Sequence, residues 1–228
     1  MSKHVILLIG SPKSYASTSN ALGDYLIKKL EKQGFVSDKI YIYDAMKTDK
    51  DAVHILQSID DADLLILTFP LYVDNIPSQV IALLELIFKH RSLQKEPKKQ
   101  KILSLSNSGF PEASQSETAH AICRKFASET KIEWIGGLAL GGGGAIGGTN
   151  LEDVGRIGGG VRKALELVAN SICEDKPLPD EALKLMKRPL VSPLMYTWFG
   201  DAAWKKAAKE NGVENRLYER PYQASEDS

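Results

Sequence analysis

The sequence predicts an α/β fold in which a doubly wound parallel sheet carries helices on both faces. Short apolar runs alternate with helical patterns five times along the first 175 residues, as expected for successive βα units. The run at 63–69 is apolar apart from Asp63 and Thr68, the pattern of a strand buried on both faces of a parallel sheet. We therefore expect five parallel strands joined by right-handed crossovers.

The first unit consists of an apolar strand at 5–9 and an amphipathic helix at 19–33. Leucines recur at helical spacing in this helix, and Gly34 is expected to end it. The other expected strands are 39–43, 63–69, 102–105 and 132–140, and the other expected helices are 49–59, 77–90, 115–129 and 151–172.

The composition changes from residue 176 on, where prolines at 177, 179, 189 and 193 interrupt the helical pattern. We expect a helix at 201–211 that ends near Gly212, and a disordered polar tail after 222. The chain thus divides into a sheet domain (1–175) and a helical extension with its tail (176–228). Four aromatic side chains of the extension need burial against the sheet domain, against a neighbouring subunit or at the rim of a ligand pocket: Tyr196, Trp198, Phe199 and Trp204.

The composition excludes several classes of partner. Lys plus Arg equals Asp plus Glu, 29 each, so no net charge favours nucleic acid or an anionic membrane as a partner. No apolar run approaches the roughly 18 residues of a membrane span, and we expect a cytoplasmic protein. Cys123 and Cys173 are too far apart in sequence to suggest a metal or iron–sulfur site.

The loop after the first strand, Gly10-Ser-Pro-Lys-Ser-Tyr-Ala-Ser-Thr-Ser19, is rich in hydroxyl groups and opens a helix. Hydroxyls and the first amide groups of a helix together favour a bound phosphate monoester. The loop has neither the P-loop pattern nor Gly-x-Gly-x-x-Gly, so a mononucleotide such as FMN is favoured over a nucleoside triphosphate or a dinucleotide. The alternative is that Ser17 or Thr18 is only a helix N-cap.

The loops 11–19, 70–77 and 106–115 follow different strands and should meet at the carboxyl edge of the sheet. In the second loop, Tyr72 offers an apolar surface for a flat ring, or it simply packs on Pro77. In the third, Gly109 would let the backbone approach such a ring, although Asn and Gly are also common in plain turns.

Three motifs carry a resemblance to a known family. Gly10-Ser-Pro-Lys13 with Ser17-Thr18, Pro70-Leu-Tyr72, and Ser108-Gly-Phe-Pro-Glu112 are similar to motifs of flavodoxin-like NAD(P)H-dependent FMN reductases, including their iron–sulfur flavoprotein branch. The resemblance covers about the first 175 residues and implies a flavodoxin-like sheet of strand order 2-1-3-4-5. The cysteines of the cluster-binding branch are absent, so no cluster is implied.

The resemblance also implies a function. The chain would be an FMN-dependent oxidoreductase that passes hydride from NADH or NADPH through flavin N5 to a small acceptor such as a quinone, a nitro compound, free flavin or a metal complex. Because the flavin carries the chemistry, no catalytic side chain is assigned. The alternatives are a flavodoxin-type one-electron carrier and a flavin-free binding protein, and a homo-oligomer remains open.

The resemblance assigns residues to each part of the cofactor. The FMN phosphate would contact Ser11, Lys13, Ser17, Thr18 and Ser19. The ring would lie against Pro70, Leu71, Tyr72 and Val73, with Ser106, Asn107, Ser108, Gly109 and Phe110 along its polar edge.

The segment Gly141-Gly-Gly-Gly-Ala-Ile-Gly-Gly148 contains a Gly-x-Gly-x-x-Gly match, but so glycine-rich a segment matches almost any glycine pattern. No downstream βαβ unit supplies a ribose-binding acid. We interpret the segment as a flexible loop that could act as a lid over the flavin or nicotinamide.

Overall fold

The computed structural model describes residues 3–47 and 49–220 and contains a five-stranded sheet in which all neighbouring strands are parallel. The strand order is β2-β1-β3-β4-β5, which confirms the expected topology. The strands are β1 (His4–Ile9), β2 (Val36–Tyr41), β3 (Leu64–Pro70), β4 (Lys101–Asn107) and β5 (Glu133–Leu140).

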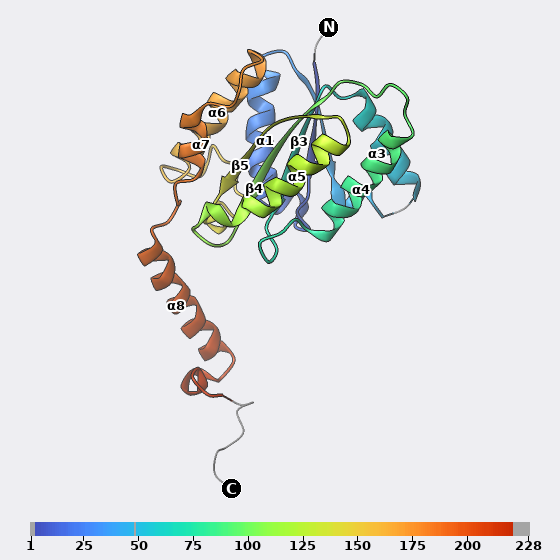
Figure 1. Cartoon of the computed structure of the whole chain (residues 1–228). Helices are drawn as coiled ribbons and strands as arrows, with labels where there is room; N and C mark the ends of the chain where they lie inside the picture. Colours follow the sequence, from blue (N-terminus) through green and yellow to red (C-terminus); the bar gives the residue numbers. More distant parts are fainter. Residues whose placement is uncertain (1–2, 48, 221–228) are drawn as a thin grey trace. The chain divides into compact units, whose positions relative to one another are not determined.

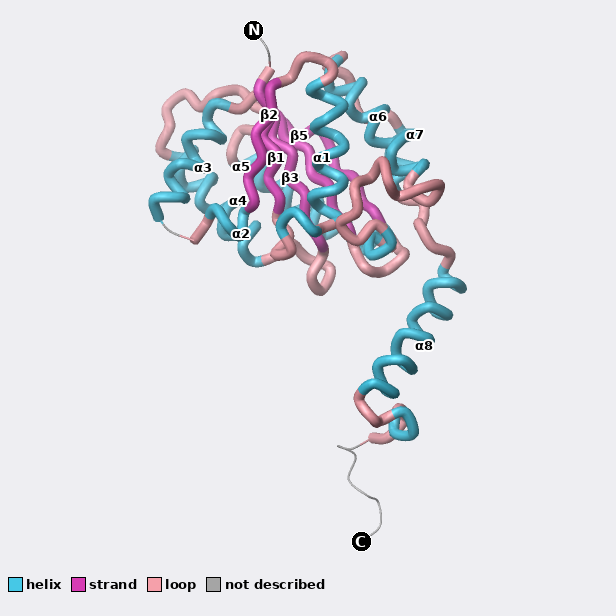
Figure 2. Tube along the Cα trace, turned by 180° about the vertical axis from the view of Figure 1, so that it is seen from behind, coloured by secondary structure: helices cyan, strands magenta, loops and turns pink. Residues whose placement is uncertain are grey.

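Helices cover both faces of the sheet (Figure 1 and Figure 2). One face carries α1 (Thr18–Glu31), α6 (Gly159–Cys173) and α7 (Asp180–Met186). The other carries α3 (Asp49–Asp61), α4 (Ser78–Ser92) and α5 (Glu117–Glu129). Alternate residues of β1 enter the two resulting cores, because successive side chains of a strand point to opposite faces.

Short elements complete the fold. A single helical turn, α2 (Ile42–Ala45), follows β2. The 3₁₀ helices are η1 (Ser14–Ala16), η2 (Ala113–Ser116), η3 (Gly143–Ala145) and η4 (Glu214–Arg216). Of these, η1 and η3 lie in loops at the carboxyl edge of the sheet.

One strand and one helix of the sheet domain have boundaries that differ clearly from the expected ones. The strand expected at 39–43 spans Val36–Tyr41, because it pairs with β1 from His4↔Val36 onward. As an edge strand, it contains the polar residues Ser37, Asp38 and Lys39. The helix expected at 151–172 begins only at Gly159. Arg162 holds the preceding turn by donating to the carbonyls of Leu151 and Gly155, each at 2.8 Å.

The chain forms two compact units, Met1–Leu190 and Val191–Ser228. Helix α7 therefore belongs with the sheet, whereas the sequence assigns residues from 176 on to the extension. In the second unit, α8 (Pro193–Glu210) begins earlier than the expected 201–211, because Pro193 starts a helix instead of interrupting one. The disordered tail expected after 222 lies outside the described residues.

Within the second unit, the four aromatic side chains of α8 remain exposed, from 37% for Tyr196 to 72% for Trp204. These side chains are therefore not buried within the second unit itself, and their burial against another surface stays a prediction. No helix within residues 3–47 and 49–220 has the length and apolar character needed to cross a membrane.

Candidate functional site

A pocket opens at the carboxyl edge of the sheet, where ligands of doubly wound sheets bind. Its volume is about 350 Å³, at the small end of the range of small-molecule sites. We call it the loop pocket, and its lining consists of Ser11, Lys13, Ala16, Ser17, Thr18, Ser19, Pro70, Leu71, Tyr72, Asn107, Ser108, Gly109, Gly144 and Gly147.

The structure brings most of the expected site residues together in this lining, with three exceptions. Val73 is fully exposed at the tip of its loop, and Phe110 lies half-exposed outside the lining. Ser106 is fully buried beneath the pocket. The sequence pattern missed Ala16, Gly144 and Gly147, although the run of glycines was a signal for the last two.

Ser106 points away from the loop pocket toward α5. Its Oγ is hydrogen-bonded to Nε2 of His120 at 2.9 Å, while Nδ1 of the same ring is bonded to Oγ of Ser104 at 2.6 Å. Burial lowers the pKa of His120 to about 4, so the ring is neutral at pH 7. A side chain at Gly137 would collide with this ring. A lone histidine on a helix gave no sequence signal for this cluster.

Ser17 is the N-cap of α1. Its Oγ accepts a hydrogen bond from the amide of Asn20 at 3.1 Å, and its hydroxyl donates to the carbonyl of Ser14 at 2.6 Å. Because this hydroxyl already has an acceptor, Ser17 serves first to start the helix.

Thr18 and Ser19 differ in what their hydroxyls can still do. The Thr18 hydroxyl donates to the carbonyl of Gly143 at 2.8 Å. Asn107 Nδ2 donates to Ser19 Oγ at 2.8 Å and to the carbonyl of Phe69 at 3.2 Å. Since the Ser19 oxygen accepts from Asn107, its own hydrogen is left to donate to a ligand.

Further donors lie beside Ser19. As the first two residues of α1, Thr18 and Ser19 have amide groups without a carbonyl one turn earlier to bond. Ser11 Oγ accepts from the amide of Lys13 at 3.3 Å. Lys13 makes no ion pair within the described part of the chain. This end of the loop pocket therefore has the chemistry of an anion site.

The loop after β3 gives the pocket its apolar side through Pro70, Leu71 and Tyr72. The Leu71 amide donates to the Asn107 carbonyl at 2.8 Å, which joins this loop to the end of β4. Tyr72 and Asn75 exchange two backbone hydrogen bonds, at 3.0 and 3.1 Å, around a tight turn. Tyr72 is 48% exposed, so one side of its ring can receive a planar ligand.

The glycine segment 141–148, expected from its composition to be a flexible loop, is hydrogen-bonded on two sides. The amides of Gly142 and Gly143 donate to carbonyls of the loop after β4, at 2.7 and 2.8 Å. The Gly143 carbonyl accepts from Thr18, and Ile146 is buried in the core. The segment is therefore a wall of the loop pocket.

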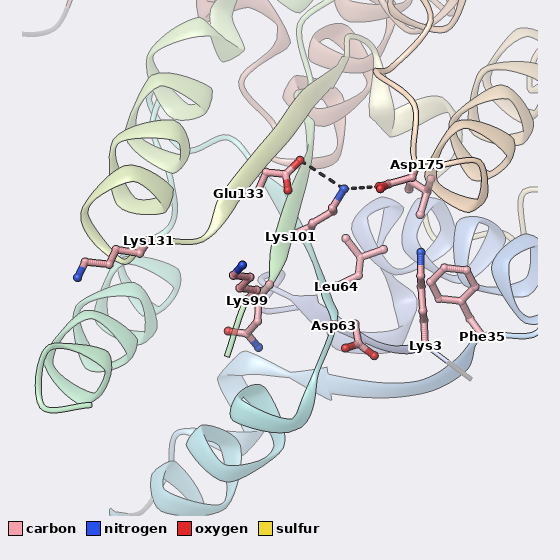
Figure 3. A pocket seen from close by; sticks show the side chains of 11 residues that line it. Lys3, Phe35, Asp63, Leu64, Lys99, Lys101, Lys131, Glu133 and Asp175 are labelled. Carbon is pink, nitrogen blue, oxygen red and sulfur yellow. Dashed lines mark hydrogen bonds and ion pairs between the residues drawn. The ribbon is translucent and has the colours of Figure 1, made fainter. Parts of the chain in front are cut away.

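A second pocket lies at the opposite edge of the sheet, around the starts of the strands, and has a volume of about 360 Å³ (Figure 3). Lys101 is ion-paired there with Glu133 at 3.3 Å and also with Asp175. The Lys3 ammonium lies 5.9 Å from the centre of the Phe35 ring. Because its central lysine is already neutralised and ligands bind at the other edge, we assign no site here.

Within the described residues, no group of three or more His, Cys, Asp or Glu side chains could hold a metal ion. Burial raises the pKa of the Cys123 thiol to about 12, so this cysteine is an inert core residue at neutral pH.

Comparison with known proteins agrees with this fold. The family described as "Flavodoxin-like fold" matches residues 3–140, in agreement with the resemblance carried by the three loop motifs. None of the curated proteins compared matches the chain.

Solved structures with similar folds include three oxidoreductases. An FMN-dependent NADH-azoreductase from Bacillus anthracis in complex with FMN has a TM-score of 0.55 and 14% identity, over 75% of this chain and 100% of its own. An NAD(P)H:quinone oxidoreductase from Methanothermobacter marburgensis has a TM-score of 0.57 and 14% identity, over 77% and 96%. An NADH:FMN oxidoreductase in its apo form has a TM-score of 0.60 and 13% identity, over 85% and 98%.

Proposed function

The chain belongs to the family of proteins with the flavodoxin-like fold, and we propose that it is an FMN-dependent oxidoreductase. In this proposal it takes electrons from NADH or NADPH and passes them to a small acceptor, such as a quinone, a nitro compound, free flavin or a metal complex. The observation that carries the proposal is the loop pocket, which combines an anion site at the start of α1 with an apolar wall after β3.

The anion site fits the phosphate of FMN. The donors available to a phosphate are the amides of Thr18 and Ser19, the Ser19 hydroxyl and the Lys13 ammonium. Ser11 is also in reach of the same space. The Ser17 and Thr18 hydroxyls already donate hydrogen bonds within the protein. Fewer side chains are therefore available to bind the phosphate than the five expected from the sequence.

The apolar wall fits the flavin ring. Pro70, Leu71 and Tyr72 would support one face of the ring, while Ser108 and Gly109 lie along the opposite loop. When bound, FMN supplies the redox chemistry by accepting a hydride from the nicotinamide. The protein would bind the ring, orient it and leave space for a second planar molecule, and holding both rings in register would supply most of the rate.

The similar structures support the same class of reaction, since the three named above are described as reductases or oxidoreductases that use NADH or NAD(P)H. At 13–14% identity they support the fold and not a particular acceptor.

The proposal is tested by reconstituting the purified protein with FMN and adding NADH or NADPH without oxygen. We expect rapid loss of the visible absorbance of the flavin in a single two-electron reduction, and ping-pong kinetics when a quinone is the acceptor. Bound FMN that neither nucleotide reduces, but that a chemical reductant reduces in two separate one-electron steps, would instead identify a carrier. Protein that binds no flavin contradicts the proposal altogether.

A further inference from the structure

For most glycines around the loop pocket, the protein itself explains why a side chain would be unfavourable. Gly142, Gly147 and Gly148 have left-handed backbones, with φ of 69°, 58° and 90°. A Cβ on Gly143 would lie 3.1 Å from Oδ1 of Asn107, which leaves little room for a side chain.

Neither a left-handed backbone nor a close neighbouring atom explains the glycine at position 144. Its φ is not in the left-handed region, and no atom of the described residues, apart from its own chain neighbours and helix backbone, lies within 4 Å of a Cβ built on it. Only Gly109, Gly160 and Gly200 share this property among the glycines so tested. Gly160 and Gly200 lie in helices α6 and α8, whereas Gly109 and Gly144 both line the loop pocket.

The position of Gly144 relates it to one end of the pocket. Its neighbour Gly143 accepts the hydrogen bond of Thr18 at 2.8 Å, and a Cβ on Gly148 would lie 2.6 Å from the Ala16 backbone. The glycine segment therefore packs on the start of α1, where the anion site lies. Gly144 and the first residues of α1 thus line the same pocket.

We propose that Gly144 is a contact residue for the ribityl–phosphate chain of the flavin, which passes over its bare backbone. The inference rests on the proposed FMN binding and adds a role for the glycine segment. Because Thr18, the loop after β4 and buried Ile146 hold the segment in place, it forms a fixed wall along this chain. A Cβ at position 144 would extend into the space of the ligand and would contact no neighbouring atom of the protein.

The experiment compares three flavins that share the ring. FMN carries ribityl and phosphate, riboflavin carries ribityl alone, and lumiflavin carries neither. Dissociation constants are measured by fluorescence titration for the parent, for Gly144→Val and for the matched control Gly160→Val, which places the same side chain in open space on α6. Gly144→Ala provides a second, smaller obstruction, and urea unfolding verifies the fold of each variant.

We expect Gly144→Val to lose about tenfold or more in affinity for FMN and for riboflavin, as overpacking of a fitted site would cause. Lumiflavin affinity should change by less than about twofold, Gly144→Ala should show a smaller loss of the same kind, and Gly160→Val should match the parent. Equal losses for all three flavins would place Gly144 at the ring and overturn the inference, as would unchanged binding by folded Gly144→Val. A parent protein that binds none of the flavins would instead contradict the proposed function.

Discussion

Asn107, the last residue of β4, donates a 2.8 Å hydrogen bond from Nδ2 to the Oγ of Ser19, 88 residues earlier in the second position of α1. Both side chains are buried. The bond fixes the Ser19 hydroxyl as a donor toward the loop pocket, because its oxygen already accepts. Asn107 is thus a positioning residue for the anion site.

The Asn107–Ser19 pair predicts that Ser19→Ala weakens FMN binding by about 10- to 100-fold, as expected for loss of one hydrogen bond to a charged group. Riboflavin binding should stay near that of the parent, because riboflavin has no phosphate. The ratio of the two dissociation constants, measured by fluorescence titration, checks this. A ratio equal to that of the parent would show that the Ser19 hydroxyl does not contact phosphate.

Thr18→Val should act on stability instead of on phosphate recognition. Valine has no hydroxyl group, so the buried Gly143 carbonyl loses the hydrogen bond that Thr18 donates to it. The free energy of unfolding should therefore fall by about 1–3 kcal/mol. Thr18→Ser keeps the hydroxyl and serves as the matched control. Urea unfolding measures the loss. FMN and riboflavin affinities should fall by the same factor in Thr18→Val, and a selective loss of FMN would mean that Thr18 turns its hydroxyl to the phosphate.

The sequence predicted the sheet because its central strands have a simple pattern. β3 is apolar apart from Thr68 and is buried on both faces. The edge strand β2 was misplaced because its half-exposed residues, Val36-Ser-Asp-Lys-Ile-Tyr41, carry no continuous apolar run. The start of α8 was missed because proline ends some helices and begins others, and the choice depends on whether the preceding residue, here Ser192, can cap.

The site was predictable where a loop follows a strand end, since topology alone brings such loops together. The role of each hydroxyl was not predictable. Ser17, Thr18 and Ser19 all carry a hydroxyl group, and only their hydrogen-bond partners in the structure separate a helix cap from a wall contact and from a free donor. Ser106 departed from expectation because side chains alternate along β4, which turns this hydroxyl to α5.

The turn after Tyr72 contains backbone strain that substitution should relieve. Val73 and Asp74 have φ of 49° and 58°, and the left-handed region is unfavourable for a β-branched residue. Val73→Asn should raise the free energy of unfolding by about 1 kcal/mol, because asparagine tolerates this conformation. Val36→Asn, at an exposed position of β2, is the control and should not stabilise. Thermal unfolding compares them, and a destabilised Val73→Asn would refute strain at this turn.

The buried His120 ring should make the free energy of unfolding sensitive to acid. Its pKa falls from 6.5 to about 4 on burial, so the unfolded chain binds a proton at pH values where the folded chain does not. Above about pH 6.5 the two states are both neutral at this ring and there is no penalty. As the pH falls from about 7.5 to 5, His120 should reduce the free energy of unfolding by about 2 kcal/mol.

The variant His120→Asn has no titrating ring and retains polar atoms facing Ser104 and Ser106. We expect it to be less stable than the parent at pH 7.5, where it loses the packing of the ring, yet to lose about 2 kcal/mol less on acidification. His54→Asn, at an exposed position of α3, is the matched control for removal of a histidine. Urea unfolding at the two pH values measures all three proteins. If the parent and His120→Asn lose the same free energy on acidification, the folded protein protonates His120 as readily as the unfolded chain does, and the prediction is wrong.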